Sequence, residues 1–226
     1  MPTLVKFRRD LEKSKPLRMY SKGMIVNGGG KMGLLRGYSY RLEAEPGRGF
    51  DERFSPRYSP QEMLEMGVFE GKYLNDCLDE FPREWFETAF SIGKLSPVKP
   101  NVHCNYFGIH SRQPLYVWVE NGWAPSLDYD EREKEKEKEK EKEKGRKKRD
   151  MLGDPSLNPD ERGWFQWYCR YWLGRRMPVL DDVQIGRWRS FTRHVGAVRK
   201  GCEAGDLSCR RRERQALLQW SYDPFL

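Results

Sequence analysis

The sequence lacks long apolar runs. No stretch approaches the roughly 20 consecutive apolar residues that a membrane-spanning helix needs, and the first residues lack the pattern of a signal peptide. The five cysteines are an odd number, which does not suit a complete disulfide framework. We therefore expect an intracellular protein of the nucleus or cytoplasm, without membrane contact, whose thiols are reduced and free.

Apolar residues are also few, and many of those present are aromatic. Hydrophobic residues make up 37% of the chain, below the usual share of a globular protein, whereas charged residues make up 34%, above it. Aromatic residues nevertheless reach 13%, with eight Trp. Since disordered chains are poor in aromatic residues, we expect a folded core built mainly from Trp, Tyr and Phe.

The charge is positive and unevenly distributed. The net charge is +8, and residues 131–149 account for +4, with eleven Lys or Arg against seven Glu. Residues 161–226 hold thirteen Lys or Arg against seven Asp or Glu. This balance favours an anionic partner, nucleic acid first, although an ordinary solvated surface has the same composition.

The first 57 residues are predicted to form a flexible basic arm. Two stretches, NGGGKMGLLRG (27–37) and EPGRGFDERFSPRYSP (45–60), are rich in Gly, Pro and Arg. The GGGKMG sequence lacks the G-x-x-x-x-G-K-[ST] spacing of a phosphate-binding loop. We therefore expect no such loop in this region.

A single folded domain is predicted over residues 58–226. Ser59 and Glu62 form a capping-box pattern that begins a helix, and Gly67 ends it. A second short helix follows in FPREWFETAF (81–90), whose Trp and Phe residues form an apolar face. The next stretch, RQPLYVWVENGW (112–123), alternates in the manner of a strand and ends in an Asn-Gly turn.

Residues 128–154 are predicted to be a disordered insertion in this domain. Glu and Lys alternate strictly over residues 133–144, which leaves no apolar face to pack. The following GRKKRD (145–150) is either a nuclear import signal or a continuation of the charged run, and the sequence does not separate the two.

The C-terminal block predicts three helices. The first spans about 159–173, capped by Asn158 and ended by Gly174, and we expect its many rings to pack in the core rather than to form a stacking platform for bases. The second is expected over 182–199 with Asp181 as its cap. The third begins at Ser208.

Arginines gather in this block, four of them between residues 210 and 214, where a helix N-terminus disfavours positive charge. A bound phosphate reverses that effect, because the backbone N–H groups and the guanidinium groups then face the same anion. The alternative is internal pairing with the carboxylates of Asp181, Asp182, Glu203 and Asp206.

The connections between the helices are too long for a standard helix-turn-helix motif. The candidate phosphate ligands are Arg189, Arg193, Lys200, Arg210, Arg211, Arg212 and Arg214.

Residues suited to catalysis are densest in NVHCNYFGIHSRQP (101–114). His103, Asn105 and His110 there are candidates for a general base or for the activation of a nucleophile. A structural loop, whose His and Asn side chains bond to the backbone, is the alternative.

We expect no metal or cofactor. Six residues separate Cys202 from Cys209, which is wider than the usual spacing of zinc ligands, and Cys169 and His194 are the candidates to complete a set of four. The carboxylates of NDCLDE (75–80) are able to bind Mg²⁺, but such a cluster is typical of a solvated turn.

The motifs GWFQWYCRYWLGRR and GDLSCRRRERQALLQW, together with residues 59–86 and 105–123, resemble a family of uncharacterised hypothetical proteins of fungi, algae and large DNA viruses. The resemblance extends from Ser59 to about Pro224, without the Glu-Lys run. It implies that both folded blocks belong to one domain. It implies no activity, because the family has no established function.

The sequence thus predicts a mainly α fold with a small β element, in one compact domain with a C-terminal three-helix block. The leading functional hypothesis is a nucleic-acid-associated protein that binds phosphates through the arginine face of the C-terminal helices. An enzyme that acts on nucleic acid or nucleotides is the second hypothesis, and a scaffold for acidic protein partners is the third.

Overall fold

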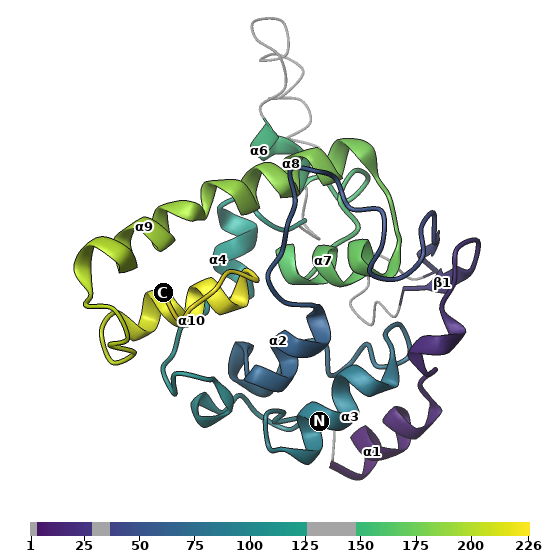
Figure 1. The fold of residues 1–226 in the computed structure, drawn as a ribbon. Helices are drawn as coiled ribbons and strands as arrows, with labels where there is room; N and C mark the ends of the chain where they lie inside the picture. Colours follow the sequence, from purple (N-terminus) through teal and green to yellow (C-terminus); the bar gives the residue numbers. More distant parts are fainter. Residues whose placement is uncertain (1–3, 29–36, 126–147) are drawn as a thin grey trace, which may run out of the picture.

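Short helices separated by long irregular connections make up the chain (Figure 1). The computed structural model describes residues 4–28, 37–125 and 148–226. They are mostly helical with one small antiparallel sheet, which confirms the predicted fold class. In these residues the helices are α1 (Leu4–Lys13), α2 (Pro60–Met66), α3 (Arg83–Ser91), α4 (Leu115–Glu120), α6 (Lys148–Gly153), α7 (Trp164–Leu173), α8 (Pro178–Ser190), α9 (Thr192–Gly201) and α10 (Arg211–Gln219). The strands are β1 (Ile25–Asn27) and β2 (Ser39–Arg41), and short 3-10 turns are η1 (Leu17–Met19), η3 (Phe69–Gly71) and η4 (Val102–Cys104).

The first predicted helices are confirmed. Ser59 caps α2 through a complete capping box with Glu62, and Gly67 ends the helix. Helix α3 packs against α2 and buries Trp85 and Phe86 completely.

The strand predicted in residues 112–123 is wrong, because Leu115–Glu120 of this stretch form α4. Its alternation of aromatic and β-branched residues is typical of a strand, but tertiary packing overrides such preferences. The ring of Trp118 lies against Gly163, where a Cβ would come within 2.7 Å of the ring. Gly163 has φ 75°, so both its backbone conformation and this contact require glycine.

Helix α7 begins later than predicted. Residues 159–162 form a turn, and the helix starts at Trp164 after Gly163. Gly174 ends it, as predicted, in the left-handed conformation, and a Cβ there would lie 2.1 Å from the carbonyl oxygen of Ala44.

The single helix predicted over 182–199 is two helices, α8 and α9, which break at Phe191. Asp181 is not an N-cap residue but lies in the first turn of α8, where its carboxylate accepts hydrogen bonds from Met177 N (2.7 Å) and Trp167 Nε1 (2.8 Å). Helix α10 also starts later than expected, with Arg210 rather than Ser208 at its N-cap.

The described part of residues 1–57 is not a flexible arm, because it contributes to the core. Phe7 and Leu11 of α1 are buried, and the ring of Phe7 lies 5.2 Å from that of Phe90 of α3. Further along, Tyr20 and Phe54 are also buried. This expectation is therefore wrong for the residues described.

Four charged side chains form a buried network beneath the sheet residue Tyr40. Arg170 makes two bonds to Glu80, at 2.5 and 3.0 Å, and one to Asp160 at 2.9 Å. Arg175 makes two further bonds to Asp160, at 2.9 and 2.7 Å. All four side chains are at most 2% exposed. The network joins α7 to the segment before α3.

The cysteines also differ from expectation. Cys202 and Cys209 form a disulfide that joins the end of α9 to the residues before α10, so they are not free thiols. Cys77, Cys104 and Cys169 are unpaired and buried, and burial raises the pKa of each thiol.

Several predicted segments fall partly or wholly outside the described residues. The glycine-rich stretch at 29–36, the Glu-Lys run at 133–144 and the start of GRKKRD are among them. Of the predicted disordered insertion, residues 148–153 form α6 with Leu152 buried, so that prediction is wrong at its C-terminal end. No helix in the described part of the chain is long and apolar enough to cross a bilayer.

Candidate functional site

The candidate phosphate ligands lie on α8, α9 and α10, and most are exposed. Helices α9 and α10 pack against each other, and α4 lies between them in the view of Figure 1. Arg193 and Arg212 line one large cavity, whereas Arg189 lines a separate and smaller hollow with Arg53. The exposed members are Arg189, Arg193, Lys200, Arg210, Arg211 and Arg212.

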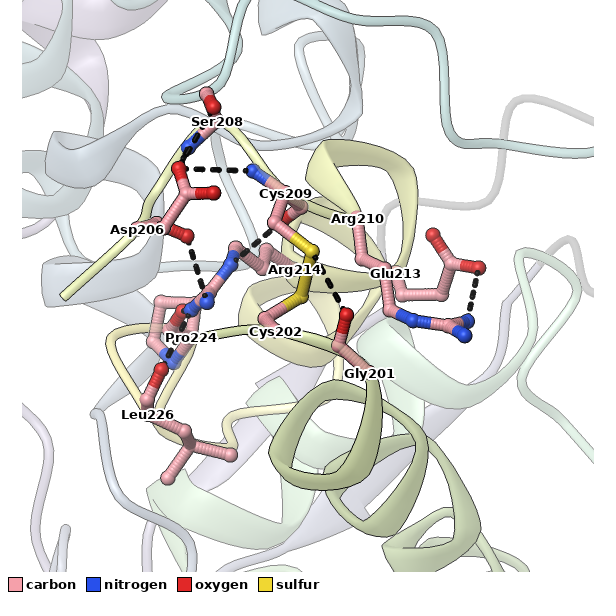
Figure 2. The surroundings of a disulfide bond; sticks show 10 residues. All are labelled: Gly201, Cys202, Asp206, Ser208, Cys209, Arg210, Glu213, Arg214, Pro224 and Leu226. Carbon is pink, nitrogen blue, oxygen red and sulfur yellow. Dashed lines mark hydrogen bonds and ion pairs between the residues drawn. A yellow bond between two sulfur atoms is a disulfide. The ribbon is translucent and has the colours of Figure 1, made fainter. Parts of the chain in front are cut away.

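Arg214 is a correction to this set, because its side chain is fully buried. Figure 2 shows its guanidinium group bonded to the backbone: it donates to the carbonyl oxygens of Cys209 (2.9 Å), Asp206 (3.0 Å) and Pro224 (2.5 Å) and to the main-chain oxygen of Leu226 (3.0 Å). Arg214 thus fastens the loop before α10 to the last residues and is not available to a phosphate.

The remaining arginines near residue 210 are only partly neutralised within the protein. Nη1 of Arg210 lies 3.5 Å from Oε1 of Glu213, a contact that Figure 2 shows. Each of the two side chains is more than a third exposed. Arg211 donates to the carbonyl oxygen of Phe107. No carboxylate of the described residues pairs with Arg193, Lys200 or Arg212. We call the four side chains Arg193, Lys200, Arg210 and Arg212 the cationic rim.

The large cavity has a volume of about 1370 Å³ and lies among α4, α7, α8, α9 and α10. Six of its lining side chains are cationic and only two, Asp76 and Glu213, are carboxylates. Both carboxylates already pair with arginines. The cavity therefore carries an excess of positive charge. The cationic side chains are Lys72, Arg112, Arg162, Arg187, Arg193 and Arg212.

Arg187 of α8 is the most unusual of these side chains. Its guanidinium carbon lies 5.8 Å from the ring centroid of Trp118 and 5.6 Å from that of Trp220. It donates one hydrogen bond, to Oε1 of Gln184 at 2.9 Å, and no described carboxylate pairs with it. Burial alone lowers the pKa of Arg187 to about 10. Arg187 is thus a cation at neutral pH that lines the cavity without a counter-charge.

Two further donors at the cavity are buried without a partner. Arg162 pairs with Asp76 through Nη2, but its Nη1 has no hydrogen-bond acceptor, and the side chain is 10% exposed. Nε1 of Trp164 has no acceptor either. Nearly all buried polar groups in proteins are bonded, so these two unbonded donors, both closed to solvent, are unusual among the side chains of the cavity lining.

Aromatic side chains form a stacked column along one wall of the cavity. The ring of Trp164 lies 5.2 Å from Tyr168 and 4.6 Å from Trp220, and Trp220 lies 4.7 Å from Phe191, with interplanar angles of 25° or less. His194 follows Phe191 at 4.2 Å. The expectation that the rings of α7 pack in the core is confirmed, since Trp164, Trp167, Tyr168 and Tyr171 are at most 2% exposed, and Trp164 also borders the cavity.

His110 also lines the cavity, and the structure joins it to Asn105 through a third residue. Nδ1 of His110 bonds to Oε1 of Glu70, whose other oxygen pairs with Nε of Arg112 at 3.1 Å. Asn105 accepts a hydrogen bond from the backbone N–H of Glu70 at 2.8 Å. A carboxylate on Nδ1 orients the ring and leaves Nε2 for proton transfer. His103 does not belong to this group: it is exposed in η4 and does not line the cavity.

The described residues hold no cluster of three or more side chains suited to a metal. Of the NDCLDE carboxylates, Asp76 pairs with Arg162 and Glu80 with Arg170, so the predicted alternative of a magnesium site does not form. The zinc set does not form either, because Cys202 and Cys209 are bonded to each other.

Sequence reasoning missed Glu70 and the special position of Arg187. Glu70 lies 40 residues before His110, so the spacing of the two residues does not indicate that they pair. The composition around Glu70 does not indicate its backbone conformation in η3, where φ is 57°. Arg187 is one of many arginines in its block, and only the folded chain places it beside Trp118.

No protein-family model, curated protein or solved structure matches this chain. The resemblance to uncharacterised fungal, algal and viral proteins therefore stays a prediction.

Proposed function

We propose that the protein binds nucleic acid, with the cationic rim in contact with the phosphates. The observation that carries this proposal is the scarcity of internal partners for the rim. Among the described residues, only Arg210 of the rim pairs with a carboxylate. Arg210 and Arg212 also lie at the start of α10, where the helix dipole disfavours them by roughly 0.3–1 kcal/mol each unless an anion is present.

The salt dependence of binding tests the proposal. For single strands, the logarithm of the affinity falls against log salt by about 0.7 for each phosphate contact. Replacing all four rim residues by Gln is expected to weaken binding and to reduce this slope by about 3, because four contacts are lost. Filter binding of a single-stranded oligonucleotide at several salt concentrations measures both quantities.

The matched control replaces four exposed cations elsewhere, Lys13, Lys15, Arg18 and Lys22, by Gln. The net charge falls by the same amount, but these residues do not line the cavity. An equal loss of affinity in both variants would mean that only the overall charge matters, which contradicts the proposal.

A second candidate function is an enzyme that acts on nucleic acid or nucleotides. The observation that favours it is the His110–Glu70 pair at the cavity, in the arrangement of a general base with an orienting carboxylate. Cleavage of a labelled RNA strand by the protein is expected to disappear in His110→Gln and to persist in His103→Gln. If the unchanged protein leaves the strand intact, this candidate fails.

A further inference from the structure

We propose that the cavity takes up one unpaired nucleotide of a single strand, with its phosphate at Arg187 and its base against the aromatic wall. The inference rests on the proposed function and deepens it, because it names the form of nucleic acid that the protein selects. Its central residue, Arg187, does not belong to the cationic rim, so the two proposals are separable by mutation.

The position of Arg187 indicates an anionic ligand. Arg187 is partly shielded from water, and a shielded charge without a partner is unfavourable, so proteins usually pair or neutralise such groups. Arg187 has neither remedy among the described residues: its only hydrogen bond goes to a neutral amide, and its pKa of about 10 keeps it charged at neutral pH. A phosphate supplies the missing charge, and its oxygens suit the geometry of a guanidinium group.

The donors beside Arg187 support the same ligand. Nη1 of Arg162 and Nε1 of Trp164 are buried, lack acceptors and belong to side chains that line the cavity. Both atoms are closed to solvent, so the acceptor atoms of a phosphate or a base edge reach them only after a small rotation of the two side chains toward the cavity.

The walls of the cavity favour an aromatic ligand. Trp118, Trp220 and Phe191 line it, and the last two belong to the stacked column. Stacking of a base on an aromatic side chain is a principal source of affinity for single strands. In a duplex both faces of each base are covered by neighbouring bases, so only an unpaired base is free to use this wall.

The size of the cavity fits a strand better than a free nucleotide. Its volume of about 1370 Å³ exceeds the roughly 300–1,000 Å³ that is typical of small-molecule pockets. Arg193 and Arg212 belong both to its lining and to the cationic rim, so a strand has a continuous cationic path from the rim to Arg187.

The test compares Arg187→Gln with Arg189→Gln, a cation two residues away that lines the other hollow. Filter binding uses a single-stranded oligonucleotide and the duplex of the same sequence. Arg187→Gln is expected to weaken single-strand binding roughly 10- to 100-fold, the value of a charged hydrogen bond, and to leave duplex binding unchanged. Arg189→Gln is expected to change either by less than about threefold, as for an exposed charge.

Thermal unfolding separates a binding role from a structural one. Arg187 is half-buried and has no counter-charge among the described residues, so the midpoint of Arg187→Gln is expected to be unchanged or higher. A lower midpoint together with weaker binding would mean that Arg187 supports the fold, and the inference would be wrong.

Three competitors distinguish the sources of the ligand. Inorganic phosphate, adenosine monophosphate and poly-glutamate are added to the complex with the single strand, and all three are expected to compete poorly. If the mononucleotide displaces the strand as efficiently as unlabelled strand does, the cavity binds a free nucleotide and the inference is wrong. If poly-glutamate displaces the strand efficiently, the cavity binds an acidic protein and the inference is also wrong. If the rim variant loses binding while Arg187→Gln does not, the inference fails and the proposed function stands.

Discussion

Single residues in this chain take roles that their chemical type does not reveal. Arg170, Arg175, Arg187 and Arg214 are all arginines of the C-terminal block, yet the first two are matched by buried carboxylates and Arg214 by backbone oxygens. Arg187 alone of the four faces the cavity. The sequence predicted a basic block, but the partners of each guanidinium come from distant segments and follow only from the folded chain.

The buried charge network gives the first prediction. Asp160→Asn removes the carboxylate that Arg170 and Arg175 share, which leaves two guanidinium groups less than 3% exposed with too few acceptors. We expect a loss of about 3–5 kcal/mol in the free energy of unfolding, as for other broken buried pairs. Chemical denaturation followed by circular dichroism measures it.

The control for this substitution is Arg53→Gln, which breaks exposed pairs with Asp51 and Asp182 at 2.8 Å. Such pairs contribute less than about 1 kcal/mol. A loss of stability in Asp160→Asn as small as that in Arg53→Gln would contradict the importance of the network.

The exposed pair gives a prediction about pH. Hydrogen bonds from Arg53 lower the pKa of Asp51 to about 2. The folded value is below the ordinary value of about 4, so the contribution of this carboxylate is complete above pH 4 and is lost as the pH falls through 2. In a carbon NMR titration the midpoint of Asp51 is expected near 2 and should rise toward 4 in Arg53→Gln. A midpoint that does not move on this substitution would contradict the assigned cause.

Elements that are fixed by local chemistry were predictable, and those fixed by packing were not. The capping box of α2 and the glycine at the end of α7 act within a few residues, and both predictions are confirmed. Helix α4 reads as a strand because its side chains are β-branched and aromatic, and only its contact with α7 shows otherwise. No Gly or Pro stands at the break between α8 and α9, so the sequence did not indicate that the helix ends there. The break occurs where Phe191 stacks on Trp220.

The connection between α9 and α10 gives a prediction at this scale. The disulfide closes a loop with a sequence separation of 7, for which the chain-entropy relation gives roughly 2 kcal/mol of stability. Replacing both Cys202 and Cys209 by Ser is expected to lower the free energy of unfolding by this amount. The unchanged protein in a reducing buffer should behave like the double variant, because the remaining cysteines are buried thiols. A double variant as stable as the oxidised protein would show that Arg214 alone holds the loop.

At the scale of the whole molecule, the N-terminal region and the later blocks share one core. The sequence suggested an arm because Gly, Pro and Arg are frequent before residue 58. Average composition does not reveal that a few apolar residues in such a segment are buried in the core. Phe7, Leu11 and Tyr20 are such anchors, each at most 7% exposed. The position of the cavity was likewise not predictable, since it depends on how α4 meets the helices α7, α8, α9 and α10.

Deletion of residues 1–22 tests this shared core. The loss of three buried apolar side chains is expected to cost roughly 5–9 kcal/mol of stability, at about 1.5–3 kcal/mol for each. Denaturant unfolding compares the deletion with Arg9→Ala and Lys13→Ala, which change exposed positions of α1 and should stay within about 0.5 kcal/mol of the unchanged protein. An equally stable deletion variant would restore the interpretation of a dispensable arm.

The crowding of indole rings around one hollow has a practical consequence. Trp118, Trp123, Trp164 and Trp220 all border the cavity, half of the eight tryptophans in the chain. Indole emission responds to any group that comes into contact with the ring, and nucleobases quench it efficiently. Binding of a nucleotide in the cavity is therefore expected to lower the intrinsic tryptophan fluorescence of the protein, so binding is measurable without a dye.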